Sequence, residues 1–177
     1  TVMGSTPASS CLRRDGARPG DHVCVSGTLG DAAAGLAIIE GNLKASDQAA
    51  AEFLKRRFSA PTVRLALGES LLRVATSAID LSDGLLLDAE HVAKASAVAI
   101  EIDSCKIPLS PAMRTLPDSS RSLQWALAGG DDYELLVTLP PGEPVPGLLT
   151  EIGRVTTGRG VSCDQLPAKR GYDHFAG

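Results

Sequence analysis

Alternating apolar and polar positions along the chain predict several short strands. Val23 and Val25 lie between a Pro-Gly-Asp turn signal and two glycines, which predicts a turn, a short strand and a loop. In AVAIEID (97–103), three β-branched residues alternate with Glu101 and Asp103, a pattern typical of a half-buried strand. Two more strands are expected, one in TSAIDLS and one in the run LLVTL that two prolines end.

Apolar residues at helical spacing fill much of the remaining chain. Asp31 is expected to cap a buried helix that Gly41 closes. Ser46 or Asp47 is expected to cap the next helix, which Pro61 stops and whose last turn carries the basic run KRR. Further helices are expected over about 63–75, over 83–96 with Asp83 at or near the N-cap, over SLQWALA, and over a short stretch at 148–152 in a tail with one or two edge strands.

The order of these elements indicates the fold class. Strands and helices alternate along the chain, and no internal repeat is visible. This order is typical of α/β or α+β folds, in which helices are layered on a mixed sheet. With 177 residues, 44% of them hydrophobic, the chain can bury an ample core, so one domain is the default expectation.

Charge and apolar runs exclude several classes of partner. The net charge of −4 provides no basic footprint for nucleic acid or for a membrane surface. No apolar run reaches the roughly 18 residues of a membrane helix, and the first residues lack the basic stretch and apolar core of a signal peptide. We therefore expect a soluble protein with no nucleic-acid or membrane partner.

Cysteine usage indicates the redox compartment. The four cysteines are scattered, with no CxxC pair and no histidine at zinc-finger spacing. Buried free thiols in a reducing compartment are therefore favoured over disulfides or metal ligands, which predicts a cytoplasmic location. These residues are Cys11, Cys24, Cys105 and Cys163.

The junction IDLSDGLLL (79–87) carries the first candidate chemistry. Asp80, Ser82 and Asp83 stand where a strand gives way to a helix. Two carboxylates there offer oxygen ligands to a hard divalent cation, beside backbone N–H groups that attract phosphate oxygens. Mg²⁺ with a phosphate ester is the natural occupant. The alternative is structural, with Asp83 a helix cap and Asp80 a solvated acid at a strand end.

A second acidic loop, AGGDDYEL (128–135), strengthens the functional interpretation. Its glycines allow a tight turn or a close approach to a ligand, and its three acids crowd negative charge at a helix end. That crowding destabilises the helix end unless a metal, an arginine such as Arg14, or a cationic ligand compensates it. The alternative is a solvated acidic turn.

Other catalytic templates are absent from the sequence. There is no GxxxxGK[ST] loop and no dinucleotide fingerprint, and the histidines have no nucleophile at a recognisable spacing. The segment GYDHF (171–175) stands out in a chain with only 3% aromatic residues. Its aromatic side chains could stack on a planar ring or anchor the tail in the core.

Five blocks together resemble a known family. In chain order they are LRRDGARPGDHVCVSGTLGDAAAGLAI, SAIDLSDGLLLDAEHVAKAS, IPLSP, WALAGGDDYELLVTLP and GYDHF. They resemble thiamine-monophosphate kinases, which belong to the superfamily of aminoimidazole ribonucleotide synthetase and selenophosphate synthetase. The resemblance implies phosphoryl transfer from ATP to thiamine monophosphate, with several Mg²⁺ ions and no covalent enzyme intermediate. It also implies a C-terminal domain built on a mixed sheet layered with helices.

The resemblance implies roles for individual residues, none of them a covalent catalyst. Asp80 and Asp83 match Mg²⁺ ligands of the family, and Ser82 matches a contact to ATP. Arg14 matches a nucleotide-binding arginine, with Arg13 as the alternative if the register differs by one. Asp131 and Tyr172 match contacts to thiamine phosphate, which agrees with an acid beside a cationic thiazolium and a ring against a flat heterocycle.

The chain departs from the family in its length. Members have roughly twice this length and two domains, and their N-terminal metal-binding segments have no counterpart here. The expected division is therefore 1–10 as a terminal strand of a missing N-terminal domain and 11–177 as the C-terminal domain. The complete enzyme is expected to be a homodimer, and this chain alone to be inactive.

Two other functions remain open at the level of sequence. The first is another enzyme of the superfamily, acting like selenophosphate synthetase or in purine synthesis; Asp131 and Tyr172 argue against it. The second is a non-catalytic module that binds Mg-nucleotide and retains the acidic residues.

Overall fold

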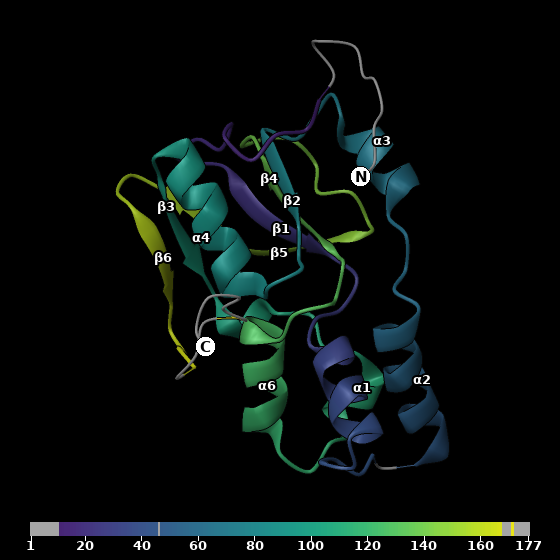
Figure 1. Cartoon of the computed structure of the whole chain (residues 1–177). Helices are drawn as coiled ribbons and strands as arrows, with labels where there is room; N and C mark the ends of the chain where they lie inside the picture. Colours follow the sequence, from purple (N-terminus) through teal and green to yellow (C-terminus); the bar gives the residue numbers. More distant parts are fainter. Residues whose placement is uncertain (1–10, 46, 168–170, 172–177) are drawn as a thin grey trace.

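The computed structural model describes residues 11–45, 47–167 and 171. Its centre is a six-stranded sheet with the strand order β2-β4-β1-β5-β3-β6 (Figure 1). Among the described residues every strand pair is antiparallel except β3 with β6, so the expected mixed sheet is confirmed. The strands are β1 (His22–Ser26), β2 (Ser77–Asp80), β3 (Ala99–Ile102), β4 (Leu135–Leu139), β5 (Leu149–Thr156) and β6 (Gly160–Cys163).

Helix α4 (Leu85–Ser96) covers one face of the sheet (Figure 1). Its apolar residues recur at helical spacing, and they pack on strand residues that alternate with residues of the opposite face. Together they form the largest buried cluster. Its members from α4 and the central strands include Leu85, Leu86, Ala89, Val92, Val23, Val25, Ile100, Ile152 and Val155.

The opposite face of the sheet carries a smaller apolar cluster. Cys24 lies between Val23 and Val25 on β1, so its side chain points away from α4. It packs with Val137 of β4 and with helix α3 (Leu65–Leu71). Helix α3 therefore covers the part of this face near β2 and β4.

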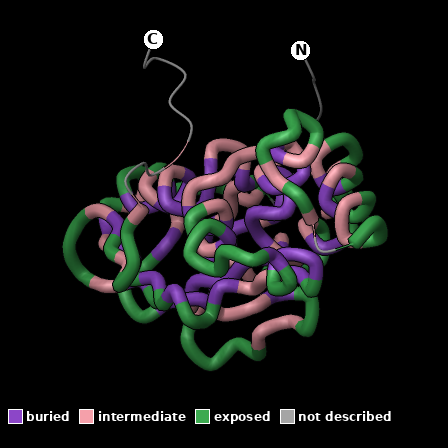
Figure 2. Tube along the Cα trace, turned by 90° about the horizontal axis from the view of Figure 1, so that it is seen from below, coloured by how far each residue is buried: buried purple, intermediate pink, exposed green. Residues whose placement is uncertain are grey.

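The remaining helices gather at one end of the sheet, where Figure 1 shows α1, α2 and α6 side by side. Asp47 caps α2 by accepting from the Ala50 amide at 2.8 Å, as the sequence predicts. Seen from this end, buried segments run through the molecule, and exposed segments lie at its outline and on the face turned to the viewer (Figure 2). These elements are α1 (Asp31–Ile39), α2 (Gln48–Ser59), η1 (Ser104–Lys106), α5 (Pro111–Arg114) and α6 (Ser119–Ala128).

The prediction of a short helix at 148–152 is wrong, because residues 149–152 begin strand β5. This strand is internal to the sheet, between β1 and β3, so of the expected tail strands only β6 lies at an edge. The register against β1 shifts at Ile152, where Val23 pairs with Gly153 but Cys24 pairs with Glu151. This bulge places buried residues three apart in the strand, a spacing that imitates a helix.

Two local expectations also need correction. Asp31 is not the cap of α1: Gly30 takes that position with a φ of +81°, and Asp31 is the first helical residue, fully buried. All four cysteines are free, but only Cys24 is buried, whereas Cys11 and Cys105 are exposed. Burial raises the pKa of the Cys24 thiol to about 12.

Two sequence-based expectations concern the chain ends and membranes. The segment 1–10, predicted to be a strand of another domain, lies outside the described residues. Within the part of the chain that the structure describes, no helix has the length and apolarity needed to cross a membrane.

Candidate functional site

The two acidic loops lie side by side, joined by three backbone hydrogen bonds. The amide of Asp131 donates to the carbonyl of Ser82 at 3.0 Å, and the amide of Tyr133 donates to the carbonyl of Leu81 at 2.9 Å. The amide of Leu81 returns a bond to the carbonyl of Glu134 at 2.8 Å. The loops between β2 and α4 and between α6 and β4 therefore form one structural unit, because β2 and β4 are neighbours in the sheet.

Glycines make this close approach possible. A Cβ atom at Gly130 would lie 2.5 Å from the Ser82 carbonyl oxygen, and one at Gly84 would lie 2.9 Å from the backbone of Ala128. Gly84 also has a φ of +116°, which residues with a side chain rarely adopt. Both positions therefore require glycine for steric reasons.

The joined loops form one wall of a cavity of about 500 Å³. This wall contains Ser82, Asp83, Asp131 and Tyr133. The facing side is apolar and comes from helices α1 and α2; it consists of Ala32, Ala33, Leu36 and Phe58. A cavity with an acidic wall, aromatic rings and an apolar wall suits a flat organic cation.

Asp88, in the first turns of α4, binds the backbone of the loop between β2 and α4. Its Oδ2 accepts hydrogen bonds from the amides of Ser82 and Asp83, each at 3.0 Å, and from that of Gly84 at 3.2 Å. Asp83 directly precedes the N-cap residue Gly84, so it lies near the N-cap as the sequence predicts, and Asp88 supplies the carboxylate that accepts from the loop amides. Burial is the main cause that raises the pKa of Asp88, to about 6.

Residues 131–134 alternate between the cavity and the interior. Asp131 and Tyr133 line the cavity, whereas Asp132 and Glu134 are buried. Asp132 accepts from the amide of Gly30 at 2.6 Å and from that of Ala32 at 3.2 Å, so it caps α1 from a distant part of the chain. Burial raises its pKa to about 7.

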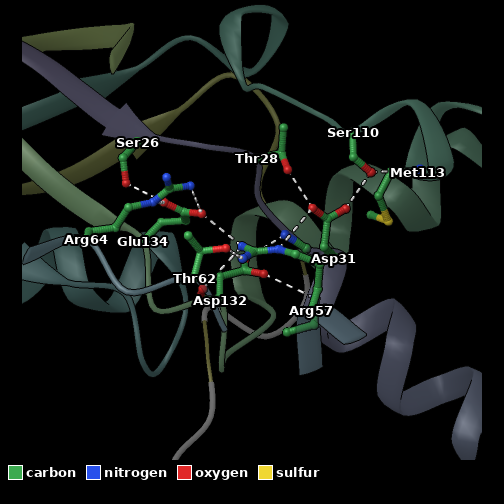
Figure 3. Close-up of polar contacts among 12 residues, drawn as sticks. Ser26, Thr28, Asp31, Arg57, Thr62, Arg64, Ser110, Met113, Asp132 and Glu134 are labelled. Atoms are coloured by element: carbon green, nitrogen blue, oxygen red, sulfur yellow. Dashed lines mark hydrogen bonds and ion pairs between the residues drawn. The ribbon is translucent and has the colours of Figure 1, made fainter. Parts of the chain in front are cut away.

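Glu134 lies at the centre of a buried ionic cluster (Figure 3). It pairs with Arg57 at 2.9 Å and with Arg64 at 2.6 Å, and it also accepts from the hydroxyl of Ser26. These two arginines compensate the buried charge of Glu134 in the second acidic loop. The sequence pattern did not predict this cluster, because Arg57 was expected only in the last turn of a helix.

Asp80 lies on the other side of Tyr133. It is exposed at the end of β2 and lines a second, mainly apolar groove of about 570 Å³. Tyr133 lines both spaces, and its hydroxyl donates to Asp131 Oδ1 at 3.3 Å. Asp131 raises the pKa of the Tyr133 phenol most, and Asp80 and Asp83 raise it further. The three carboxylates predicted from the two loops thus surround one tyrosine.

Arg14 does not join this group in the described structure. Its segment runs along the outer edge of β2, where the Arg13 carbonyl accepts from the Ala78 amide at 2.8 Å. The Arg14 side chain is exposed and lines neither cavity, and its carbonyl accepts from the Ser96 hydroxyl. Arg13, the alternative, is paired with Asp15 at 2.6 Å.

Tyr172 lies outside the described residues, but Gly171 is placed. A Cβ atom on Gly171 would lie 2.7 Å from the carbonyl oxygen of Asp83 and 2.8 Å from the Leu87 side chain. The chain therefore returns to the first acidic loop immediately before the aromatic segment.

The fit of a divalent cation depends on the donor atoms. Asp83, Asp88 and His91 each place one ligand atom within 4.8 Å of the others, a group that does not include Asp80. Its imidazole suits Mg²⁺ poorly, and one Asp88 oxygen already accepts three amide bonds. The carboxylate and hydroxyl oxygens of Asp80, Ser82 and Asp83 are of the type that Mg²⁺ takes together with substrate phosphates. The structure brings Ser82 and Asp83 into one cavity, whereas Asp80 lines the neighbouring groove.

Solved structures with this fold define the class of protein. AaThiL complexed with AMPPCP and TMP matches with a TM-score of 0.84 at 41% identity, covering 93% of this chain and 54% of that one. Thiamine-monophosphate kinase from Stenotrophomonas maltophilia matches with a TM-score of 0.80 at 39% identity, over 92% of this chain and 54% of that one. Hydrogenase maturation protein HypE of Escherichia coli, at 23% identity, shares the fold alone. The fold is that of the aminoimidazole ribonucleotide synthetase-like superfamily, as expected.

Curated relatives identify one kind of enzyme within this superfamily to which the chain is similar. Thiamine-monophosphate kinase of Salmonella typhimurium is 40% identical over 192 residues and covers 99% of this chain, and that of Aquifex aeolicus is 40% identical over 92% of it. No family model matches the chain. The chain is homologous to thiamine-monophosphate kinases along nearly its whole length, as the five sequence blocks predict. It spans 58% of the Salmonella relative and 54% of the Aquifex one.

Proposed function

We propose that this chain forms part of an enzyme that transfers a phosphoryl group from ATP to thiamine monophosphate, giving thiamine diphosphate. The observation that carries this proposal is the single cavity in which the two acidic loops meet an apolar wall. Two facts support it: homology to thiamine-monophosphate kinases, and the likeness to AaThiL, which was solved with AMPPCP and TMP.

The proposed roles follow the positions of the side chains. Asp131 faces the cavity and offers a carboxylate to the cationic thiazolium, and Tyr172 would add an aromatic contact. Asp80 and Asp83 would hold Mg²⁺, and Ser82 would contact the nucleotide beside them. When bound, Mg²⁺ neutralises the charge that develops on the transferred phosphoryl group. The Arg14 side chain is exposed and lines neither cavity, so it would contact the nucleotide from outside them.

We propose that another portion of the complete enzyme supplies the rest of the site. The relatives are considerably longer than the segment matched here, and phosphoryl transfer needs metal and phosphate contacts from more than one side. We therefore propose a complementing N-terminal domain and a homodimeric complete enzyme. Four free cysteines agree with a cytoplasmic location.

Binding measured by NMR tests the proposal. Thiamine monophosphate should shift the amide signals of residues 82–83 and 131–133, and inorganic phosphate alone should not reproduce the shifts at 131–133. Asp131→Asn should weaken binding about tenfold, because a desolvated charge contact is lost. Glu143→Gln, which removes an exposed acid elsewhere, is the matched control. If thiamine monophosphate leaves both loops unchanged, the substrate assignment is wrong.

A further inference from the structure

A buried charged cluster contains the sequence neighbours of two residues that line the candidate cavity, and Figure 3 shows its polar contacts. It contains Glu134 on the second acidic loop, Arg57 on α2, and Arg64, the N-cap residue of α3. Two of these have a direct neighbour in the cavity wall: Phe58 follows Arg57, and Tyr133 precedes Glu134. The cluster therefore connects the opposite walls of the cavity.

Arg57 reaches three separate segments from α2. Its Nη2 donates to Glu134 Oε1 at 2.9 Å and to the Asp132 carbonyl at 3.3 Å. Its Nη1 donates to Thr62 Oγ1 at 3.2 Å, and its Nε lies 3.6 Å from Asp31 Oδ2. One side chain thus fixes α2 against both the loop and the first turn of α1.

Arg64 donates two parallel hydrogen bonds to the Glu134 carboxylate. Its Nε donates to Glu134 Oε2 at 2.6 Å, and its Nη2 donates to Oε1 at 2.7 Å. The Glu134 side chain is 1% exposed and the Arg64 side chain 24% exposed. Bidentate pairing of this kind fixes direction as well as distance, so the carboxylate has one orientation.

The pair packs directly against the backbone of Gly27. A Cβ atom on Gly27 would lie 2.2 Å from Glu134 Oε1 and 2.6 Å from Arg64 Nη2, and its φ is +58°. Besides Glu134, two more buried carboxyl groups lie near Arg57, those of Asp31 and Asp132. Burial raises the pKa of Asp31 and raises that of Asp132 to about 7.

The loop at 131–134 needs tertiary contacts to stabilise it, because two of its residues have an unfavourable backbone conformation. Asp131 has a φ of +66° and Tyr133 a φ of +50°, a region that residues with a side chain rarely adopt. These are the two loop residues whose side chains line the cavity. They alternate with Asp132 and Glu134, whose buried contacts oppose relaxation to an ordinary conformation.

We propose that Arg57 and Arg64 are positioning residues that, through Glu134, set the distance between Phe58 and the wall formed by Asp131 and Tyr133. The cavity is thereby held at a width that admits a flat cationic ring between an aromatic side chain and a carboxylate. This inference deepens the proposed function and rests on it for the identity of the ligand. The positioning itself is a property of the loop and can be measured without a ligand.

Arg64→Met is the decisive variant, because Glu134 keeps its bond to buried Arg57 when Arg64 is lost. Arg64→Lys retains the charge but not the bidentate geometry. Arg56→Met is the matched control, since Arg56 precedes Arg57 on the same helix and is exposed. Three quantities are measured on the full 177-residue chain: amide hydrogen exchange, and the dissociation constants of thiamine monophosphate and of AMPPCP with Mg²⁺.

Arg64→Met should speed exchange of the Asp131 and Tyr133 amides and weaken thiamine monophosphate binding, each by about tenfold or more. Exchange in β1 and β5 and the affinity for AMPPCP should stay within about twofold, an effect below 0.5 kcal/mol. Arg64→Lys should lie between wild type and Arg64→Met, and Arg56→Met should match wild type.

Two results would overturn the positioning role. The first is an Arg64→Met variant with unchanged exchange at Asp131 and Tyr133. The second is a uniform loss of protection that includes β1 and β5, which would make Arg64 a contributor to global stability alone. A wild-type chain that binds no thiamine monophosphate would instead contradict the proposed function, and the exchange data would still decide whether Arg64 positions the loop.

Discussion

The backbone amide of Asp131 donates a hydrogen bond to the carbonyl of Ser82 at 3.0 Å, across 49 positions of sequence. It is one of three backbone hydrogen bonds that join the two acidic loops into one structural unit. It also places Asp131, the proposed substrate contact, and Asp83, a proposed metal ligand, on the same cavity wall. The following predictions test this unit and its chemistry.

Gly130→Ala should separate the two loops. The new Cβ atom would lie 2.5 Å from the Ser82 carbonyl oxygen, so the backbone must shift. We expect a loss of about 1–3 kcal/mol in the free energy of unfolding, the usual range for overpacking. Urea denaturation measures it. Gly147→Ala is the control, because a Cβ atom there has open space around it, and it should cost much less. Equal losses in both variants would contradict the tight contact at Gly130.

Asp132 should make stability depend on pH. Its pKa is raised from 3.8 to about 7 in the folded protein, so the folded state holds this proton more tightly than the unfolded state does. Its contribution to the free energy of unfolding is therefore full below about pH 4 and is lost as the pH rises through about 7.

Asp132→Asn measures this contribution, because the amide oxygen can still accept from the Gly30 and Ala32 amides. Urea denaturation of both proteins between about pH 4 and pH 8 should show the advantage of wild type over the variant shrinking as pH rises. Glu143→Gln, an exposed acid, should leave the slope unchanged. A pH-independent difference between wild type and Asp132→Asn would show that Asp132 does not titrate in this range.

The Tyr133 phenol should report a cation bound near the acidic loops. Asp131, Asp80 and Asp83 raise its pKa, because negative charges disfavour the phenolate. Mg²⁺ held by these carboxylates should lower that pKa by compensating their charges. Tyrosinate absorbance measures it in a Tyr172→Phe background, which leaves Tyr133 as the remaining tyrosine. Sodium chloride at matched ionic strength is the control. A pKa that responds equally to both salts would argue against a specific cation site.

This chain alone should make no thiamine diphosphate from ATP and thiamine monophosphate. In the proposed division of the site this chain supplies one side, and metal assistance is worth several kcal/mol in such reactions. Adding the complementing portion of the enzyme, fused or in trans, should restore turnover that depends on Mg²⁺. Detection of product by chromatography measures both conditions. Robust turnover by the purified chain alone would falsify the division of the site.

Much of the local structure could be predicted from sequence. The strands at 22–26 and 99–102 follow from alternation, and the cap at Asp47 follows from its position before an apolar run. Strand β5 could not be predicted, because its bulge at Ile152 gives the apolar spacing of a helix. The pairing partners that turn this segment into an internal strand are distant in sequence.

The sequence by itself determined that two glycine-rich acidic loops exist and which residue types they offer. Only the tertiary structure decided that β2 and β4 are neighbours, which brings these loops together. It also decided that Asp132 and Glu134 turn inward while Asp131 and Tyr133 face the cavity. The physical reason is that buried acids need partners, and the partners here are Gly30, Arg57 and Arg64, some 70 to 102 positions away. No local pattern in the chain encodes contacts over such separations.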